Sequence, residues 1–249
     1  ETIVINTKAC SIFVHRLCGH IIISLLRNDA MELYVDSANI SEIQHAVSLG
    51  MVSGVTTNPS LLAKEDPTTD VRARILEIYA LSGGHVSVEV NATEASGMLQ
   101  EAEEILGWFP EATIKIPMIP EGLKAVKELS RQDIPTNVTL IFSPTQALVA
   151  ANAGATYVSV FLGRLDDIGQ DGLNVVKDVV EIWDMHDMEA RIIAASIRHP
   201  IHVLECAKAG AHIATVPYKV LMQSLNHPLT DAGVQAFVKD YQKMLSQKS

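Results

Sequence analysis

The sequence predicts an α/β fold, a single (β/α)8 barrel. Short apolar runs alternate with helical patterns from Glu32 onward, and 48% of the 249 residues are hydrophobic, enough for one large core. Two predicted helices end alike, at Gly154 and Gly210, each directly before a new strand, which is typical of repeated βα units in a parallel sheet. A doubly wound sheet is the alternative, but neither Gly-x-Gly-x-x-Gly nor a phosphate loop follows the first strand.

Capping signals and apolar periodicity predict the first half of the barrel. Its strands are expected at 33–36, 52–56, 85–90 and 112–116. Asn39 and Glu42 have capping-box spacing before a helix that ends at Gly50. The next helix is expected at Val71–Leu81, and the one after the third strand is expected to stop at Gly107. Apolar residues at helical spacing in the third and fourth units are Met98, Ala102, Ile105, Leu123, Val126 and Leu129.

The second half follows the same pattern. Its strands are expected at 136–141, 156–161, 191–195 and 212–216. Ser143 and Pro144 supply an N-cap and a first helical residue, and Leu173, Val176, Val180 and Trp183 share a helix face. The segment 231–246, with Val234, Phe237, Val238 and Tyr241 on one face, predicts an additional C-terminal helix. It either covers its own barrel or contacts a neighbouring subunit.

Composition excludes several classes of function. A net charge of -10 argues against binding nucleic acid or an anionic membrane surface, but it is compatible with a local basic site for a phosphorylated metabolite. No run is long and apolar enough to span a bilayer. Three cysteines, Cys10, Cys18 and Cys206, leave one unpaired and favour a reducing, cytoplasmic location. Residues 1–30 are expected to be an extension of unclear role outside the catalytic domain at 31–249.

Lys115 is the most informative residue, because it lies inside the apolar run Ala112–Pro117. Dehydration disfavours the charged form of lysine, and a neutral lysine is a nucleophile that forms Schiff bases with ketones and aldehydes. The structural alternative is a strand-end lysine whose ammonium reaches water along its apolar stem. The other polar residues at strand ends favour the catalytic interpretation.

These residues lie where active sites of (β/α)8 barrels are found, at the carboxyl ends of the predicted strands. They are Asp36, Thr56, Thr57, Asn58, Glu89, Thr139, Ser159, Arg164 and Ser196. Each has a simple explanation of its own: Asp36 or Asn58 can cap the next helix, and Thr139 can be an ordinary strand residue. A lysine, two carboxylates and an arginine that converge on one barrel mouth nevertheless indicate an enzyme.

Four segments resemble the signature segments of transaldolases: Gly54–Ser60, Ile114–Pro117, Thr136–Leu140 and Ala194–Arg198. The resemblance extends from about Met31 to the C-terminus and implies the short version of the family. This subfamily also contains fructose-6-phosphate aldolases, so individual residues must separate the two activities.

Three positions favour a transaldolase. Glu89 stands where the aldolases carry glutamine, Phe161 stands where they carry tyrosine, and Ser159 follows the transaldolase pattern. Val160 replaces the usual proline but removes no reactive group. The alternatives are an aldolase that releases free dihydroxyacetone, and a non-catalytic barrel that binds sugar phosphates without a reactive lysine.

The resemblance implies transfer of a dihydroxyacetone unit from sedoheptulose 7-phosphate or fructose 6-phosphate to an aldose phosphate, in the non-oxidative pentose phosphate pathway. The implied catalytic residues are Lys115, which forms the Schiff base, Asp36, Glu89 and Thr139. The implied substrate-binding residues are Thr56, Asn58, Asn137, Ser159, Phe161, Arg164, Ser196 and Arg198.

Arg164, Ser196 and Arg198 are the candidates for binding the substrate phosphate, since arginine suits phosphate oxygens. The alternative for Arg198 is an exposed loop charge beside the His199-Pro200 turn. No metal or other cofactor is expected, because His199 and His202 have no third ligand at a recognisable spacing. The resemblance also implies a ring-like homo-oligomer, such as a decamer, in which the last helix packs across subunits.

Overall fold

The computed structural model describes residues 30–65, 68 and 70–247 and shows a closed barrel of eight parallel strands. Each strand pairs with the next along the chain, and the eighth pairs with the first. The strands are β1 (Glu32–Asp36), β2 (Gly54–Thr56), β3 (His85–Glu89), β4 (Thr113–Pro117), β5 (Thr136–Ile141), β6 (Tyr157–Phe161), β7 (Arg191–Ala195) and β8 (Ile213–Pro217). The predicted (β/α)8 barrel is confirmed.

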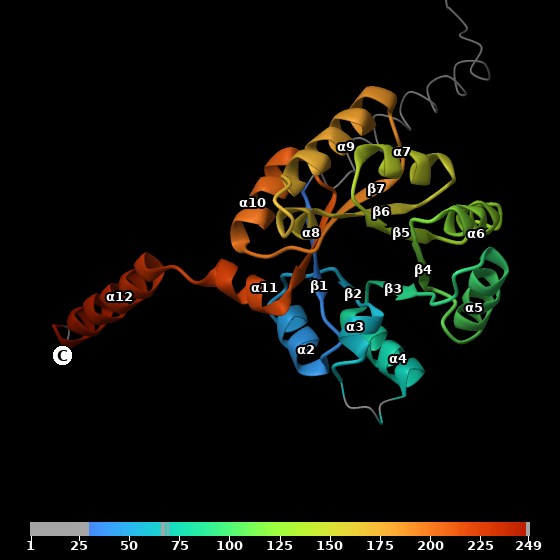
Figure 1. The fold of residues 1–249 in the computed structure, drawn as a ribbon. Coiled ribbons are helices and arrows are strands. Elements are labelled where there is room, and N and C mark those ends of the chain that lie inside the picture. Colours follow the sequence, from blue (N-terminus) through green and yellow to red (C-terminus); the bar gives the residue numbers. More distant parts are fainter. Residues whose placement is uncertain (1–29, 66–67, 69, 248–249) are drawn as a thin grey trace, which may run out of the picture. The chain divides into compact units, whose positions relative to one another are not determined.

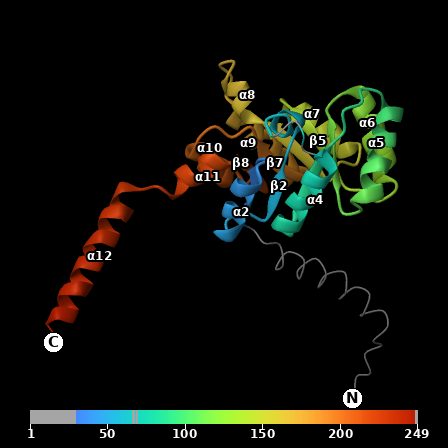
Figure 2. The ribbon, with the colours of Figure 1, turned by 90° about the horizontal axis from the view of Figure 1, so that it is seen from below.

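Helices follow the strands and surround the barrel, except for the last helix, α12 (Pro228–Ser246), which projects away from it (Figures 1 and 2). They are α2 (Ile40–Ser48), α3 (Pro59–Leu62), α4 (Val71–Ser82), α5 (Ala95–Trp108), α6 (Pro120–Ser130), α7 (Pro144–Asn152), α8 (Leu162–Asp166), α9 (Gly172–His186), α10 (Pro200–Ala209), α11 (Tyr218–Leu225) and α12 (Pro228–Ser246). The barrel belongs to the second of the two units into which the chain divides, Glu32–Ser249. The predicted extension at 1–30, with Cys10 and Cys18, lies almost entirely outside the described residues.

The structure differs from the predicted elements in four ways. The short helices α3, α8 and α11 were not predicted, and α12 begins at Pro228. The stop at Gly107 is wrong: α5 continues to Trp108, and the Phe109 N–H then closes the helix on the Ile105 carbonyl, 2.8 Å away. β2 begins only at Gly54.

The predicted capping box before α2 is half confirmed. Asn39 accepts the Glu42 backbone N–H at 3.1 Å, as expected. The Glu42 carboxylate, however, accepts a hydrogen bond from the Ser37 hydroxyl at 2.6 Å, and the Asn39 N–H donates to Ser37 Oγ. In a full capping box the Glu42 side chain would accept the Asn39 N–H; here Ser37, two residues before the cap, accepts it instead.

The interior of the barrel contains an aromatic layer at the amino ends of the strands. His85 stacks on Tyr34 with 5.1 Å between ring centroids and meets Tyr157 edge-on at 4.7 Å. Gly54 is needed beside this layer, because a Cβ there would lie 2.8 Å from the Tyr34 ring. The Arg191–Glu32 ion pair, at 2.6 Å, completes this end of the barrel.

Protonation of His85 should destabilise the barrel in acid. Burial lowers the pKa of His85 from 6.5 to about 4. Because the folded pKa lies below the unfolded one, this contribution to stability is complete above pH 6.5 and is lost as the pH falls towards 4. The free energy of unfolding should fall by about 3 kcal/mol or less across this range. Urea unfolding at a series of pH values measures the loss; His85→Gln should reduce it, and an unchanged slope in that variant would contradict this assignment.

Helix α12 has an apolar stripe that the barrel does not cover. No described residue of α12 is buried, and Phe237, Val234 and Tyr241 are 76%, 56% and 59% exposed. Its amphipathic character is as predicted. Among the described residues no helix combines the length and hydropathy needed to cross a bilayer.

Candidate active site

Lys115 points into the barrel from β4 and is buried. Its side chain is 6% exposed, so the ammonium does not reach water along its stem, and the structural alternative for this residue is wrong. The ammonium lies 2.9 Å from Glu89 Oε2 on β3 and donates to the Thr57 carbonyl at 3.0 Å. Parallel pairing places Glu89 directly opposite Lys115, so adjacent strands hold the pair in register. Two of the predicted catalytic residues are therefore in direct contact.

Asp36 ends β1 within the electrostatic reach of this pair. Burial raises the pKa of Asp36, while the charge of Lys115 and a hydrogen bond from Thr56 act against the rise. Thr56 Oγ1 donates to Asp36 Oδ1 at 2.9 Å, so its own oxygen accepts from Thr215 on β8. This chain of hydroxyls fixes the orientation of the carboxylate.

Asn137 on β5 has both ends of its side-chain amide satisfied, by one residue on the neighbouring strand β6 and one on β3, two strands away. Its Oδ1 accepts from the Ser159 hydroxyl at 2.8 Å, and its Nδ2 donates to Ser87 Oγ at 3.1 Å. Asn137 is fully buried. This geometry favours a role in positioning Ser159, whereas direct contact of Asn137 with substrate stays a prediction.

Thr139 lies beside an irregularity in β5. Between Val138 and Ile141 the pairing with β6 shifts by one residue, and Leu140 has a φ of +62°, which is strained for a branched side chain. The buried Oγ1 of Thr139 has no hydrogen-bond partner in the described part of the chain, and the same is true of Thr57 Oγ1. A buried hydroxyl without a partner is suited to hold a water molecule or a substrate oxygen.

Asn58 and Phe161 border the site from the carboxyl ends of two different strands, β2 and β6. Asn58 is half-buried and caps α3 by accepting the Leu61 N–H at 3.0 Å, which leaves its amide nitrogen for other partners. Phe161 meets Phe142 edge-on at 5.9 Å, and the guanidinium of Arg164 lies 5.0 Å from the centre of the Phe161 ring. Asn58 therefore also has the capping role that its sequence position allowed.

The three predicted phosphate residues come from two segments that lie against each other. Arg164 is on α8, directly after β6, and is exposed. Ser196 follows β7 with a φ of +62°. Arg198 lies in the loop after β7 with its side chain 44% exposed, as the alternative of an exposed loop charge expects, and it is paired with Asp167 at 2.6 Å. Gly163 forms the contact between the segments, because a Cβ there would overlap the Ser196 carbonyl oxygen and lie 2.9 Å from Arg198 Cγ.

Gly163→Ala should therefore disturb the predicted phosphate site. The added methyl must displace the Ser196 backbone, so we expect a loss of about 1–3 kcal/mol in stability and a higher KM for phosphorylated substrates. Gly107→Ala, on α5 with open space around it, is the matched control and should not lower stability. Kinetics and thermal unfolding of both variants measure the difference; equal behaviour would contradict the close packing at Gly163.

A cavity of about 680 Å³ borders the site between α4 and α5. Thr57, Asn58 and Glu89 lie on its wall, and Trp108 and Arg72 line its outer part. Neither Lys115 nor the three phosphate candidates are among its lining residues, so the cavity meets the site at Glu89, Thr57 and Asn58 only. Its volume is within the range of small-molecule sites.

Sequence reasoning missed Ser87 and Thr215, which support the predicted residues through hydrogen bonds. Both are buried residues in the interior of the barrel. Strand alternation alone places them inside, and a buried hydroxyl in an apolar strand was the available signal.

A buried lysine with carboxylates at the carboxyl end of its barrel defines a (β/α)8 enzyme. The chain belongs to the transaldolase/fructose-6-phosphate aldolase family, whose model matches residues 33–248. A probable transaldolase of Geobacillus kaustophilus (strain HTA426) is 57% identical over 213 residues, 86% of this chain and 99% of that protein. Probable transaldolases of Desulforudis audaxviator (strain MP104C) and Alkaliphilus metalliredigens (strain QYMF) are 57% and 55% identical, again over 86% of this chain, and the matches cover 99% and 100% of those proteins. The predicted family is confirmed, and the chain is an enzyme of the transaldolase kind.

Proposed function

We propose that this enzyme transfers a dihydroxyacetone unit from sedoheptulose 7-phosphate or fructose 6-phosphate to an aldose phosphate through a Schiff base on Lys115. The observation that carries the proposal is the buried Lys115, whose ammonium lies 2.9 Å from the Glu89 carboxylate. This contact gives the amine an acceptor for the proton that it must lose before it attacks a ketone. The proposal places the chain in the short, aldolase-like subfamily with transaldolase residues at the deciding positions.

Formation of the Schiff base uses the pair of Lys115 and Glu89. The ammonium gives a proton to Glu89, and the neutral amine attacks the C2 carbonyl of the donor. Glu89 then returns a proton to the carbinolamine hydroxyl, which leaves as water, and an iminium remains on Lys115. Thr139, whose buried hydroxyl has no partner in the described residues, is placed to hold the water that relays these protons.

Cleavage uses Asp36 as the base. Its carboxylate takes the proton of the C4 hydroxyl, the C3–C4 bond breaks, and the electron pair enters the iminium to give an enamine. The aldose phosphate departs with its new aldehyde. Asn58 and Ser159 bind the hydroxyls of the three-carbon unit that remains on Lys115. In the second half the enamine attacks an acceptor aldehyde, Asp36 returns its proton to the new hydroxyl, and water releases the ketose from Lys115.

The residues near the enamine favour transfer over release of free dihydroxyacetone. Phe161 has no hydroxyl with which to activate a water molecule for protonation of the enamine. The ring is held against Phe142 and faces the guanidinium of Arg164, which stays protonated and cannot take a proton from water as a base. The enamine therefore survives until an acceptor arrives.

Release of glyceraldehyde 3-phosphate from fructose 6-phosphate, measured with and without erythrose 4-phosphate, tests the proposal. Release that depends on the acceptor supports a transaldolase. Equal release without the acceptor means an aldolase and removes the roles given to Glu89 and Phe161. If borohydride traps no substrate on Lys115, the non-catalytic sugar-phosphate barrel is favoured instead.

We also propose that the enzyme is a cytoplasmic homo-oligomer in which α12 packs against another copy. The support is the apolar stripe of α12, which includes Phe237, Val234 and Tyr241 and is exposed along the helix. Phe237→Asp should shift the mass in sedimentation towards the monomer. Lys239→Ala, on the same helix, is the control and should leave the mass unchanged. A wild-type monomer would contradict the proposal.

A further inference from the structure

Arg198 pairs with Asp167. A second pair of side chains, Asp166 and His202, holds the turn that carries Ser196 and Arg198. His202 lies in the first turn of α10, and Asp166 is the last residue of α8. His202 Nε2 lies 3.0 Å from Asp166 Oδ2, and the His202 side chain is only 12% exposed. The pair thus joins two helices that follow different strands.

Each ring nitrogen of His202 takes part in one hydrogen bond. Its Nδ1 accepts the backbone N–H of Arg198 at 3.3 Å, so this nitrogen carries no proton. The proton is therefore on Nε2 and is donated to Asp166. Burial lowers the pKa of His202, and the charges of His199 and Arg198 act in the same direction. The charge and hydrogen bond of Asp166 act against them, and the lowered pKa agrees with a neutral ring.

Asp166 is itself fixed by the following helix. Its other carboxylate oxygen accepts the Gly172 N–H, the first of α9, at 3.0 Å. A chain of hydrogen bonds thus runs from α9 through Asp166 and His202 to the backbone of Arg198. The turn at its end contains Ser196 with a φ of +62°, a conformation that needs support from its surroundings.

We propose that Asp166 and His202 are positioning residues for the phosphate site formed by Arg164, Ser196 and Arg198. They do not touch the substrate; they fix the backbone of Arg198, and through it the direction of its side chain and the strained Ser196. This inference rests on the proposed function, because that function requires a phosphate-binding site, for which these three residues are the candidates from the sequence. Asp167 aligns the guanidinium separately, through its contact with Arg198 Nη2 at 2.6 Å.

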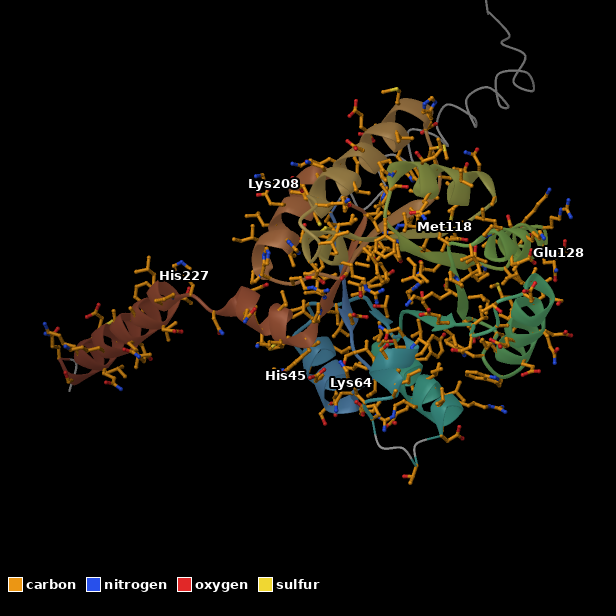
Figure 3. The ribbon with its side chains drawn as sticks, viewed as in Figure 1. His45, Lys64, Met118, Glu128, Lys208 and His227 are labelled. Atoms are coloured by element: carbon orange, nitrogen blue, oxygen red, sulfur yellow. The ribbon has the colours of Figure 1, made fainter. Side chains whose placement is uncertain are left out.

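The substitutions His202→Asn and His202→Gln each keep one of the two hydrogen bonds of His202 and remove the other. Asparagine places an acceptor near the position of Nδ1 and keeps the bond to Arg198, whereas glutamine places a donor near the position of Nε2 and keeps the bond to Asp166. His202→Ala removes both. Lys208→Ala is the matched control on the same helix: its ammonium forms a surface pair with Glu205 at 2.9 Å, and Figure 3 labels it on α10.

The test compares phosphorylated and unphosphorylated donors, fructose 6-phosphate and fructose, in all four variants. His202→Ala should raise the KM of fructose 6-phosphate about 10-fold and leave its kcat and the KM of fructose unchanged. His202→Asn should restore most of this loss and His202→Gln should restore less, because only the former holds the Arg198 backbone. An equal change for both donors, or no change, would overturn the positioning role.

Binding of inorganic phosphate, measured by calorimetry, is independent of the transfer reaction. The His202→Ala variant should bind phosphate about 10-fold more weakly than the wild type. If the wild type binds phosphate and the variant loses it while no transfer activity is found, the positioning role stands and the proposed function fails. A wild type that transfers but shows the same phosphate affinity as His202→Ala overturns the positioning role and leaves the proposed function intact.

Discussion

Lys115→Ala is expected to abolish transfer, with a loss greater than about 10⁴-fold in kcat/KM. Positioned acid–base residues contribute about 10²–10⁴-fold each, and removal of the nucleophile removes the covalent route that they serve. The rate of acceptor-dependent glyceraldehyde 3-phosphate release, with borohydride trapping and mass spectrometry of the intact protein, measures the loss.

The control for this experiment must preserve folding. Truncation of Lys115 leaves Glu89 without its ion-pair partner in a site where the carboxylate is 17% exposed, which is destabilising in itself. Lys115→Met fills the space of the stem without an amine, so a variant that melts like the wild type and does not react isolates the chemistry. Transfer by either variant at more than a trace level would contradict the Schiff-base mechanism.

The position of this lysine could be predicted from sequence because strand alternation is a local property. Within Thr113–Pro117 every second side chain points into the barrel, so the apolar neighbours of Lys115 already indicated a buried amine. The same reasoning placed Asp36 and Glu89 at strand ends. Local signals also predicted the caps at Asn39 and Ser143, both of which are present.

The features of the fold and the site that the sequence did not predict depend on contacts between segments far apart in the chain. Thr56 meets Thr215 across 159 positions of the chain, and this contact exists only once β8 has closed on β1. The stack of His85 on Tyr34 likewise depends on the stagger of the strands, which no local pattern specifies. The short helix α8 was missed because five residues carry too little periodicity to be recognised.

Asp36→Asn is expected to have the second largest effect, a fall of about 10²–10⁴-fold in kcat. Asparagine still accepts the hydrogen bond from Thr56 but cannot take a proton from the C4 hydroxyl. In the wild type the base must be ionised, so kcat/KM should fall as the pH drops through the pKa of Asp36, which burial raises. The residual activity of the variant should have no such acid limb. A limb at the wild-type position would mean that another group titrates there and would contradict the role of Asp36 as the base.

The hydrogen bond from Thr56 provides an independent test of this assignment. Thr56→Val removes the donor to the carboxylate at 2.9 Å, so the pKa of Asp36 should rise further and the acid limb should move to higher pH. Thr215→Val is the matched control, because it removes a hydroxyl that donates to Thr56 and leaves the bond to Asp36 in place. A larger shift in the Thr56 variant than in the Thr215 variant identifies Asp36 as the group that titrates. Equal shifts would mean that the hydroxyl chain acts on the site as a whole, and Asp36 would lose its role as the base.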